Sequence, residues 1–161
     1  MTNLAPGSAP VAKVEMLIRK PANEVFEAFV DPSVTSQFWF TRGSGRLEPG
    51  ARVEWHWDMY GFSVPVAVKA VDPGRRLVVE WGAAAEATTI EWTFTPLKDG
   101  TFVSIVNSGF AGGPDAVVRK ALDATEGFTF VLAGLKALLE HGVRLNLVAD
   151  RHPGGMEKSG G

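Results

Sequence analysis

Apolar residues recur at helical spacing between Gly127 and Gly142. The residues of this stripe are Phe128, Val131, Leu132, Leu135, Leu138 and Leu139. Their offsets of three and four positions place them on one face of an α-helix over more than three turns. Pro114 predicts the start of an earlier helical segment, and Gly127 marks either a kink or a break between the two. We expect the last helix to continue toward Asp150. The apolar residues behind this expectation are Val143, Leu145, Leu147 and Val148.

Between residues 46 and 110 the chain carries strand patterns instead. Apolar alternation, interrupted by Pro-Gly and Asp-Gly turns, predicts five strands in succession. They span residues 52–60, 62–71, 76–81, 88–96 and 101–110. Pro65 lacks an amide hydrogen for the ladder, so its strand is expected at a sheet edge or with a bulge at that point.

The first part of the chain combines one strand with two short helices. Alternation over residues 11–19 predicts the strand. Pro21 suits the first turn of a helix, which ends at Asp31 because the residue before a proline avoids the α region. A second helix is expected over residues 33–39. The whole order predicts an α+β fold in which helices cover one face of an antiparallel sheet of about six strands.

The composition is that of one globular domain. The chain has 161 residues, of which 45% are hydrophobic and 21% charged. We expect a single domain over residues 11–150, with flexible tails at 1–10 and 151–161. A net charge of −2 provides no basic surface for phosphates, which argues against nucleic-acid binding. Neither a secretory signal nor an apolar run long enough to span a bilayer is visible, which predicts a cytoplasmic protein.

The sequence contains no convincing catalytic or metal-binding set, and no cofactor is predicted. The absence of cysteine excludes disulfides, thiolate zinc sites and a cysteine nucleophile. The three histidines, at positions 56, 141 and 152, show no ligand spacing such as i, i+4. His56 and Asp58 share one strand face with Glu54. Because the tryptophans occupy the opposite face, a solvated outer position is favoured over acid–base chemistry for these three residues.

Strand alternation gathers aromatic residues on one face of the predicted sheet. Trp55, Trp57 and Met59 share this face, and similar groups follow on the later strands. These residues either fill the core or line a ligand pocket under the long helix. Asn107 continues the same alternation and either orients a ligand or bonds to local backbone. The candidate ligand contacts are Trp39, Trp55, Trp57, Trp81, Trp92, Asn107, Phe128, Leu132 and Leu135.

Several short sequence motifs, in this order along the chain, carry a resemblance to a known family. They are Pro21-Ala22, Phe38-Trp39, Val71-Asp72-Pro73, Arg76-Leu77, Trp92, Asp99-Gly100-Thr101, Ser108-Gly109-Phe110, Gly127-Phe128, Leu135-Lys136 and Leu139-Glu140. The chain resembles the SRPBCC or START-like helix-grip superfamily over residues 11–150. Within it, the chain is most similar to homologues of the activator of heat-shock-protein-90 ATPase. Many members carry two tryptophans at the position of Phe38-Trp39.

The resemblance implies a curved sheet that grips the C-terminal helix over an apolar cavity, without a shared catalytic set. The co-chaperone proper carries a large further domain ahead of this one, so the resemblance does not imply ATPase activation. We therefore expect a protein that binds a small hydrophobic molecule, lipid-like or aromatic, between sheet and helix. The alternatives are a cyclase- or hydrolase-like enzyme that uses the same cavity, and an interaction module that binds a chaperone or another copy of itself.

Overall fold

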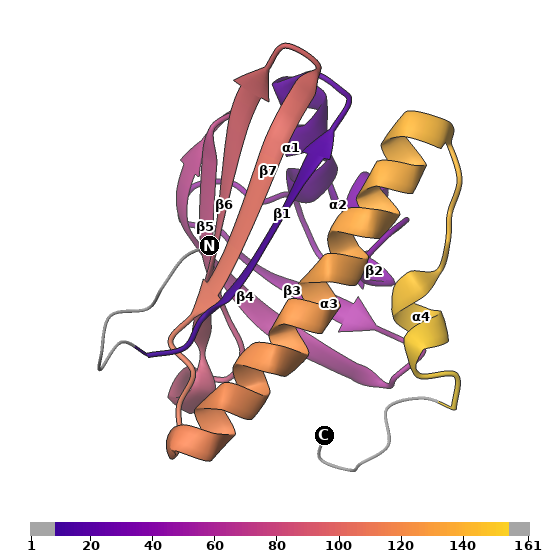
Figure 1. The fold of residues 1–161 in the computed structure, drawn as a ribbon. Helices are drawn as coiled ribbons and strands as arrows, with labels where there is room; N and C mark the ends of the chain where they lie inside the picture. The colour runs from indigo at the N-terminus through magenta and orange to yellow at the C-terminus, as the bar shows by residue number, and fades with distance from the viewer. Residues whose placement is uncertain (1–8, 155–161) are drawn as a thin grey trace.

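A curled antiparallel sheet wraps around one long helix (Figure 1). The structure is a computed structural model and describes residues 9–154. Seven strands pair in the order β1-β7-β6-β5-β4-β3-β2. The expected α+β helix-grip arrangement is confirmed, with one strand more than the six expected.

Helices and strands alternate little along the chain, since most of the strands follow one another in one block. The strands are β1 (Ala12–Ile18), β2 (Arg42–Gly43), β3 (Arg52–Trp57), β4 (Phe62–Asp72), β5 (Arg76–Trp81), β6 (Thr88–Leu97) and β7 (Gly100–Ser108). The helices are α1 (Ala22–Val30), α2 (Pro32–Thr35), α3 (Pro114–His141) and α4 (Leu147–Arg151), with a single 3-10 turn, η1 (Ala84–Glu86). The additional strand is β2, a two-residue edge strand that pairs with β3.

The inner face of the sheet is apolar, as the alternation predicted. Leu77, Trp92 and Ile105 form one continuous row across β5, β6 and β7, and all three are fully buried. Each strand therefore contributes its inward residues to one shared core, which lies between the sheet and α3.

The alternation predicted for residues 52–60 stops at Trp57, where β3 ends. Residues 58–61 form a turn instead, in which the Gly61 N–H donates to the Asp58 carbonyl at 3.2 Å. Gly61 adopts φ +72°, which glycine reaches without a steric penalty. As a result Met59, expected on the inner face, is 41% exposed, and Tyr60, expected on the outer face, is half-buried against α4.

The strand that contains Pro65 lies inside the sheet, so the expectation of an edge position was wrong. The bulge of β4 falls between Val68 and Ala70 rather than at the proline. The Gly82 N–H donates to the Pro65 carbonyl at 3.0 Å, one residue beyond the end of β5. Two residues in a hydrogen-bonded antiparallel pair exchange two hydrogen bonds. The missing N–H of Pro65 therefore removes only the second bond of its pair with Gly82, at the end of the ladder.

Two short helices carry the chain back over the sheet. α1 ends at Val30, as expected from Asp31 and the proline that follows it. Asp31 caps α2, since its Oδ1 accepts a hydrogen bond from the Ser33 N–H at 3.0 Å. α2 is shorter than the expected 33–39. The N–H groups of Gln37 and Phe38 donate at i, i+3 spacing, while that of Trp39 donates to the Thr35 carbonyl, so irregular turns replace the α-helix beyond Thr35.

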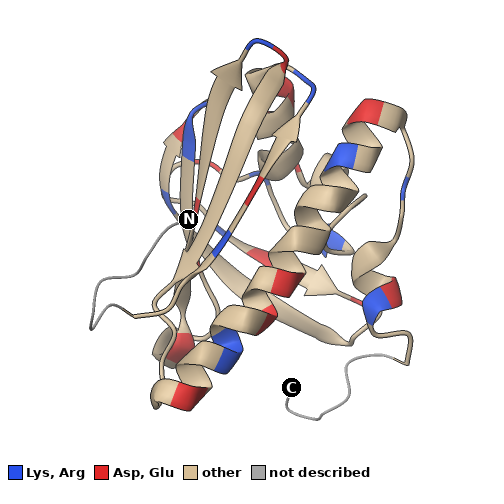
Figure 2. Ribbon diagram, in the orientation of Figure 1, with Lys and Arg blue, Asp and Glu red and all other residues tan. Residues whose placement is uncertain are grey.

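α3 is one continuous helix of 28 residues, so Gly127 does not break it. A single interior glycine costs only about 1 kcal/mol relative to alanine, and the apolar face around it remains packed. Between Glu126 and Lys136 the helix carries no charged residue (Figure 2). This uncharged part contains the residues that pack on the core. Gly134 within it faces Phe38, since a Cβ at this position would stand 3.4 Å from the Phe38 Cβ and carbonyl oxygen.

The helix ends at His141 rather than continuing toward Asp150. Gly142 adopts the left-handed conformation, φ +66°, and its N–H donates to the Leu138 carbonyl at 2.9 Å. The chain then reverses. Of the residues expected to prolong α3, Val143 and Leu145 lie in the connecting segment, and Leu147 and Val148 lie in α4, beside α3 (Figure 1). The expected tails lie largely outside the described residues, at 1–8 and 155–161.

The C-terminal turn of α3 is bound to β1 by a small polar network. The Lys136 ammonium donates to the Leu17 carbonyl and to a Glu140 carboxylate oxygen, both at 2.8 Å. The Arg19 N–H donates to the same oxygen at 2.8 Å. Burial alone would raise the pKa of Glu140, but these two hydrogen bonds, together with the charges of Lys136 and His141, outweigh burial and lower it.

This network predicts a pH-dependent contribution of Glu140 to stability. A carboxyl with a lowered pKa stabilises the fold above its ordinary value of 4.5, and the contribution is lost as the pH falls below it. We expect Glu140→Gln to lower the free energy of unfolding by about 1 kcal/mol at pH 7. The difference from the parent protein should shrink below pH 4.5, as measured by urea unfolding.

The control for this prediction is Glu91→Gln, which removes a carboxylate that pairs with Arg76 at 2.6 Å. The Glu91 side chain is 40% exposed, against 10% for Glu140. Exposed ion pairs contribute less, so we expect a loss of about 0.5 kcal/mol or less. Equal losses for the two variants would contradict the role assigned to Glu140.

Candidate functional site

A pocket of about 280 Å³ lies where α3 passes over the inner face of the sheet. Its walls come from the loop after α2, from β5, from α3 and from α4. The lining residues are Trp39, Trp81, Asp123, Ala124, Gly127, Phe128, Val131 and Val148. The α3 members are spaced by one, three or four positions and so share one side of the helix. The lining is mostly apolar, and the volume is at the small end of the range for small-molecule sites.

Trp39 connects this pocket to the core. Its indole lies 4.8 Å from that of Trp55 and 5.6 Å from the Phe128 ring, measured between ring centroids. It lies 5.9 Å from Trp81. The two remaining tryptophans, Trp57 and Trp92, are each at 6.3 Å. All five tryptophans thus belong to one cluster around Trp39, which is nearly buried. Aromatic pairs at these separations are each worth about 0.5–1.5 kcal/mol beyond the area they bury.

The residues predicted as ligand contacts divide into two groups. Trp39, Trp81 and Phe128 line the pocket. The others lie beneath it, packed in the core, and are Trp55, Trp57, Trp92, Leu132 and Leu135. Their strands and helix positions are as predicted. The three tryptophans of this group pack against the Trp39 indole, which is inserted from the loop after α2 and itself lines the pocket.

Asn107, predicted as a polar anchor, faces inward but does not line the pocket. Its side-chain amide donates to the Thr88 hydroxyl at 2.9 Å and to the Thr89 carbonyl at 2.8 Å. The same Thr88 hydroxyl accepts the indole N–H of Trp81 at 2.9 Å. Asn107 therefore bonds to neighbouring β6, the second of the two possibilities open from sequence. The network fixes the indole of Trp81, which does line the pocket.

Trp92 lacks the partner that Trp81 has. Its indole nitrogen is buried and has no hydrogen-bond acceptor among the described residues. The nearest rings are those of Phe29, at 5.6 Å, and Trp39, at 6.3 Å between centroids. An unpaired buried donor costs about 1–3 kcal/mol. The surrounding apolar contacts of this core position therefore have to outweigh that cost.

Five lining residues were absent from the predicted set. They are Asp123, Ala124, Gly127, Val131 and Val148. Val131 belonged to the helical stripe, and a helix unbroken at Gly127 places Ala124 one turn before Phe128. No comparable sequence pattern indicated Val148, because its position depends on the reversal of the chain after Gly142.

α4 reaches the pocket through a small set of contacts. The Tyr60 hydroxyl donates a hydrogen bond to the Val148 carbonyl. Arg151 pairs with Glu126 of α3, with 2.9 Å between Nε and Oε1. Burial raises the pKa of the Tyr60 hydroxyl, and Asp150 raises it further, while the charge of Arg151 opposes them. The hydroxyl therefore remains protonated, and able to donate, at neutral pH.

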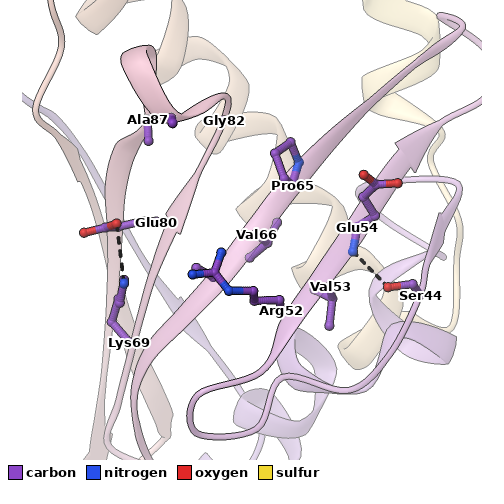
Figure 3. Close-up of a pocket in the computed structure, with 12 residues that line it drawn as sticks. Ser44, Arg52, Val53, Glu54, Pro65, Val66, Lys69, Glu80, Gly82 and Ala87 are labelled. Carbon is purple, nitrogen blue, oxygen red and sulfur yellow. Dashed lines mark hydrogen bonds and ion pairs between the residues drawn. The ribbon is translucent and has the colours of Figure 1, made fainter.

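A second, wider hollow lies on the outer face of the sheet (Figure 3). It has a volume of about 680 Å³ and is bordered by β3, β4, β5, the residues around η1 and Ser44. Lys69 and Glu80 pair within it at 3.7 Å. The Glu54 N–H donates to the Ser44 hydroxyl at 2.8 Å. A half-exposed pair of this kind indicates a solvated surface rather than a selective site.

The described residues do not bring together a metal-binding cluster. No group of three or more His, Asp or Glu side chains in residues 9–154 is placed to hold a metal ion. His56 lies on the outer face and is 3.7 Å from Glu54. Over the same residues, no helix has the length and apolar character needed to cross a membrane.

Comparison with protein families gives a direct match. The family model for activator of Hsp90 ATPase homolog 1-like proteins matches residues 19–140. The chain belongs to this family. The match runs from the end of β1 to the last turn of α3, and α4 lies beyond it. No curated protein matches the sequence.

Solved structures share the fold of this family member. Protein SSP2350 from Staphylococcus saprophyticus is 30% identical with a TM-score of 0.73, and the match covers 84% of this chain and 95% of that one. The Aha1 dimer from Colwellia psychrerythraea is 16% identical with a TM-score of 0.69, over 82% and 97%. DynU16, a putative protein in the dynemicin biosynthetic locus, is 22% identical with a TM-score of 0.75, over 85% of this chain and 49% of that one.

The network around Thr88 leads to a prediction about the pocket wall. Thr88→Val removes the acceptor of the Trp81 indole at nearly constant volume. We expect a loss of about 1–3 kcal/mol in the free energy of unfolding, because a part-buried donor loses its partner. In ¹H–¹⁵N spectra the indole resonance of Trp81 should move, while that of Trp92 stays in place.

The matched control is Thr89→Val, one residue along β6 and on the outer face by alternation. Its hydroxyl does not take part in this network, and only its carbonyl does. We expect little change in stability and no shift of the Trp81 indole resonance. Similar behaviour of the two variants would show that the Thr88 hydroxyl does not hold the indole.

Proposed function

We propose that this protein binds a small, largely apolar molecule in the pocket between Trp39, Trp81 and α3. The observation that carries the proposal is the convergence of two indoles and the Phe128 ring on one cavity of about 280 Å³. Such a lining favours apolar ligands, since aromatic faces provide a large contact area at low conformational cost. Trp39, Trp81 and Phe128 are the proposed direct contacts. The buried residues beneath them hold these contacts in place.

Size and charge narrow the class of ligand. The pocket volume suits a compound of one or two rings better than a long lipid chain. Asp123 is the ionisable residue among the described lining residues, and its carboxylate disfavours an anionic ligand nearby. A neutral or weakly basic aromatic compound therefore fits better than a fatty acid.

The alternatives have less support. An enzyme would need an ionisable group positioned toward the ligand, and the lining offers Asp123 without a second acid or base beside it. The family name and the dimeric relative keep chaperone binding and self-association as predictions. Cytoplasmic location is likewise a prediction from the sequence.

Gly127 allows the pocket to be filled without loss of stability. It lines the pocket, lies inside α3, and has open space where a Cβ would stand. Gly127→Leu should occupy the pocket with a side chain that also favours the helix. We expect it to abolish, or weaken by at least about tenfold, the saturable quenching of tryptophan fluorescence by small aromatic compounds.

Gly127→Ala provides the matched control. It should raise the free energy of unfolding by about 1 kcal/mol and leave most of the pocket free, so that binding persists. Native mass spectrometry of the purified parent protein adds a direct search for a retained ligand. The proposal fails if a broad panel of neutral aromatic and lipid-like compounds gives no saturable response. It also fails if Gly127→Leu binds them as well as Gly127→Ala.

A further inference from the structure

The segment after α3 forms a separate part of the pocket wall. We refer to residues 143–152 as the strap. It begins after Gly142, with φ +66°, and turns again at Asn146, with φ +56°. Two left-handed residues within five positions reverse the chain, so that α4 returns beside α3 (Figure 1). Asn146 is the single non-glycine residue with positive φ among residues 9–154. The family match ends at residue 140, so the strap lies outside it.

The strap closes the pocket, although its side chains are at most partly buried and Val148 is its one hydrophobic residue, among those described, that packs against the core. Val148 lines the pocket and at the same time lines a second cavity of about 100 Å³ on the loop after α2. No residue of α4 is fully buried. An element that is bordered by cavities, and that packs on the core only through the partly buried Val148, has less apolar packing to hold it than a fully buried helix.

Two side-chain contacts provide most of the specific attachment of α4. The Tyr60 hydroxyl bonds to the Val148 carbonyl and so ties the strap to the turn after β3. The pair between Arg151 and Glu126 ties it to α3. In addition, the ring of His152 lies 5.9 Å from that of Tyr60 at 77°. Both contacts are near the pocket, since Glu126 is adjacent to Gly127 and Val148 lines the cavity itself.

We propose that the strap is the gate of the pocket, with Tyr60 and Arg151 as the residues that hold it closed. The proposal rests on the proposed function, because a gate needs a ligand. Opening of α4 about Gly142 and Asn146 removes Val148 from the wall and exposes the cavity beside Trp39 and Phe128. Closure then covers the ligand with the apolar side chain of Val148. A moving segment of this kind sets the rates of entry and exit more than the affinity.

The first test follows opening itself and needs no ligand. Hydrogen exchange should show that the amides of α4 open locally, with protection far below that of residues 128–139 in α3. Exchange of α4 only through global unfolding would overturn the gate, whatever the pocket binds.

The second test locks the strap. The chain contains no cysteine, so Glu126→Cys with Arg151→Cys introduces a unique pair of thiols. A short bis-methanethiosulfonate reagent joins them, and dithiothreitol releases them again. We expect the cross-link to slow both association and dissociation of the probe 7-methoxycoumarin at least about tenfold, with smaller changes in affinity. Stopped-flow energy transfer from tryptophan measures both rates.

The third test loosens the strap. Tyr60→Phe and Arg151→Gln each remove one attachment and should speed both rates about fivefold, the equivalent of one ordinary hydrogen bond. Arg119→Gln, an exposed arginine on α3 away from the pocket, should leave the rates unchanged.

The outcomes separate the gate from the pocket. If 7-methoxycoumarin binds with the same rates in the cross-linked and released proteins, the gate is wrong and the proposed function stands. If neither 7-methoxycoumarin nor any compound of the panel binds any variant, the proposed function fails and the gate fails with it. Binding of the probe that is slowed by the cross-link and restored by dithiothreitol supports both.

Discussion

The structure depends on one insertion, that of the Trp39 indole between the sheet and α3. Its ring lies within 6.3 Å, centroid to centroid, of the other four tryptophans and also contacts Phe128. The indole comes from neither the sheet nor the long helix, but from the loop that follows α2. The two short helices therefore have a structural purpose. α2 is tied to α1 by the buried Thr35 hydroxyl, which donates to the Ala28 carbonyl at 2.6 Å, and this holds the loop in place.

The same insertion explains why the cavity is small and where it lies. The C-terminal end of α3 is bound to β1 by the network of Lys136 and Glu140, which holds this end of the helix against the sheet. The pocket lies nearer the N-terminal end of α3, at residues 123–131, where Trp39 and Trp81 also line it. A pocket remains at the surface of the aromatic cluster, rather than a deep cavity through the domain. Interiors pack densely, so space is left only where two elements diverge and no side chain is long enough to bridge them.

The two hollows of the molecule differ in the chemistry they allow. The inner pocket is smaller, but it is formed by rigid rings whose positions are fixed by packing and, for Trp81, by the Thr88 hydroxyl. The outer hollow is larger, but the charged side chains of Lys69 and Glu80 within it are half-exposed and pair with each other. Selective binding depends on preorganised contacts in a desolvated site rather than on volume. This contrast, and not size, makes the inner pocket the candidate site.

The sequence determined the class of the fold and the composition of its core. Strand alternation placed Trp55, Trp57 and Trp92 on the inner face, and helical spacing selected Leu132 and Leu135, because these patterns depend only on local backbone geometry. The sequence also carries a signal for the end of α3, because Gly142 is a residue type that commonly follows the last turn of a helix. The apolar residues beyond Gly142 nevertheless favoured a longer helix. The bulk of the aromatic set was therefore predictable as core.

Only the tertiary structure decided which of these residues face a cavity. Trp39, Trp81 and Phe128 line it, while Trp92 and Asn107 do not, and no local pattern distinguishes the two groups. The distinction depends on where Trp39 inserts and on where the chain goes after Gly142, which brings Val148 to the pocket. Both are contacts between segments far apart in the sequence. Such contacts are set by packing in three dimensions, and local periodicity carries no information about them.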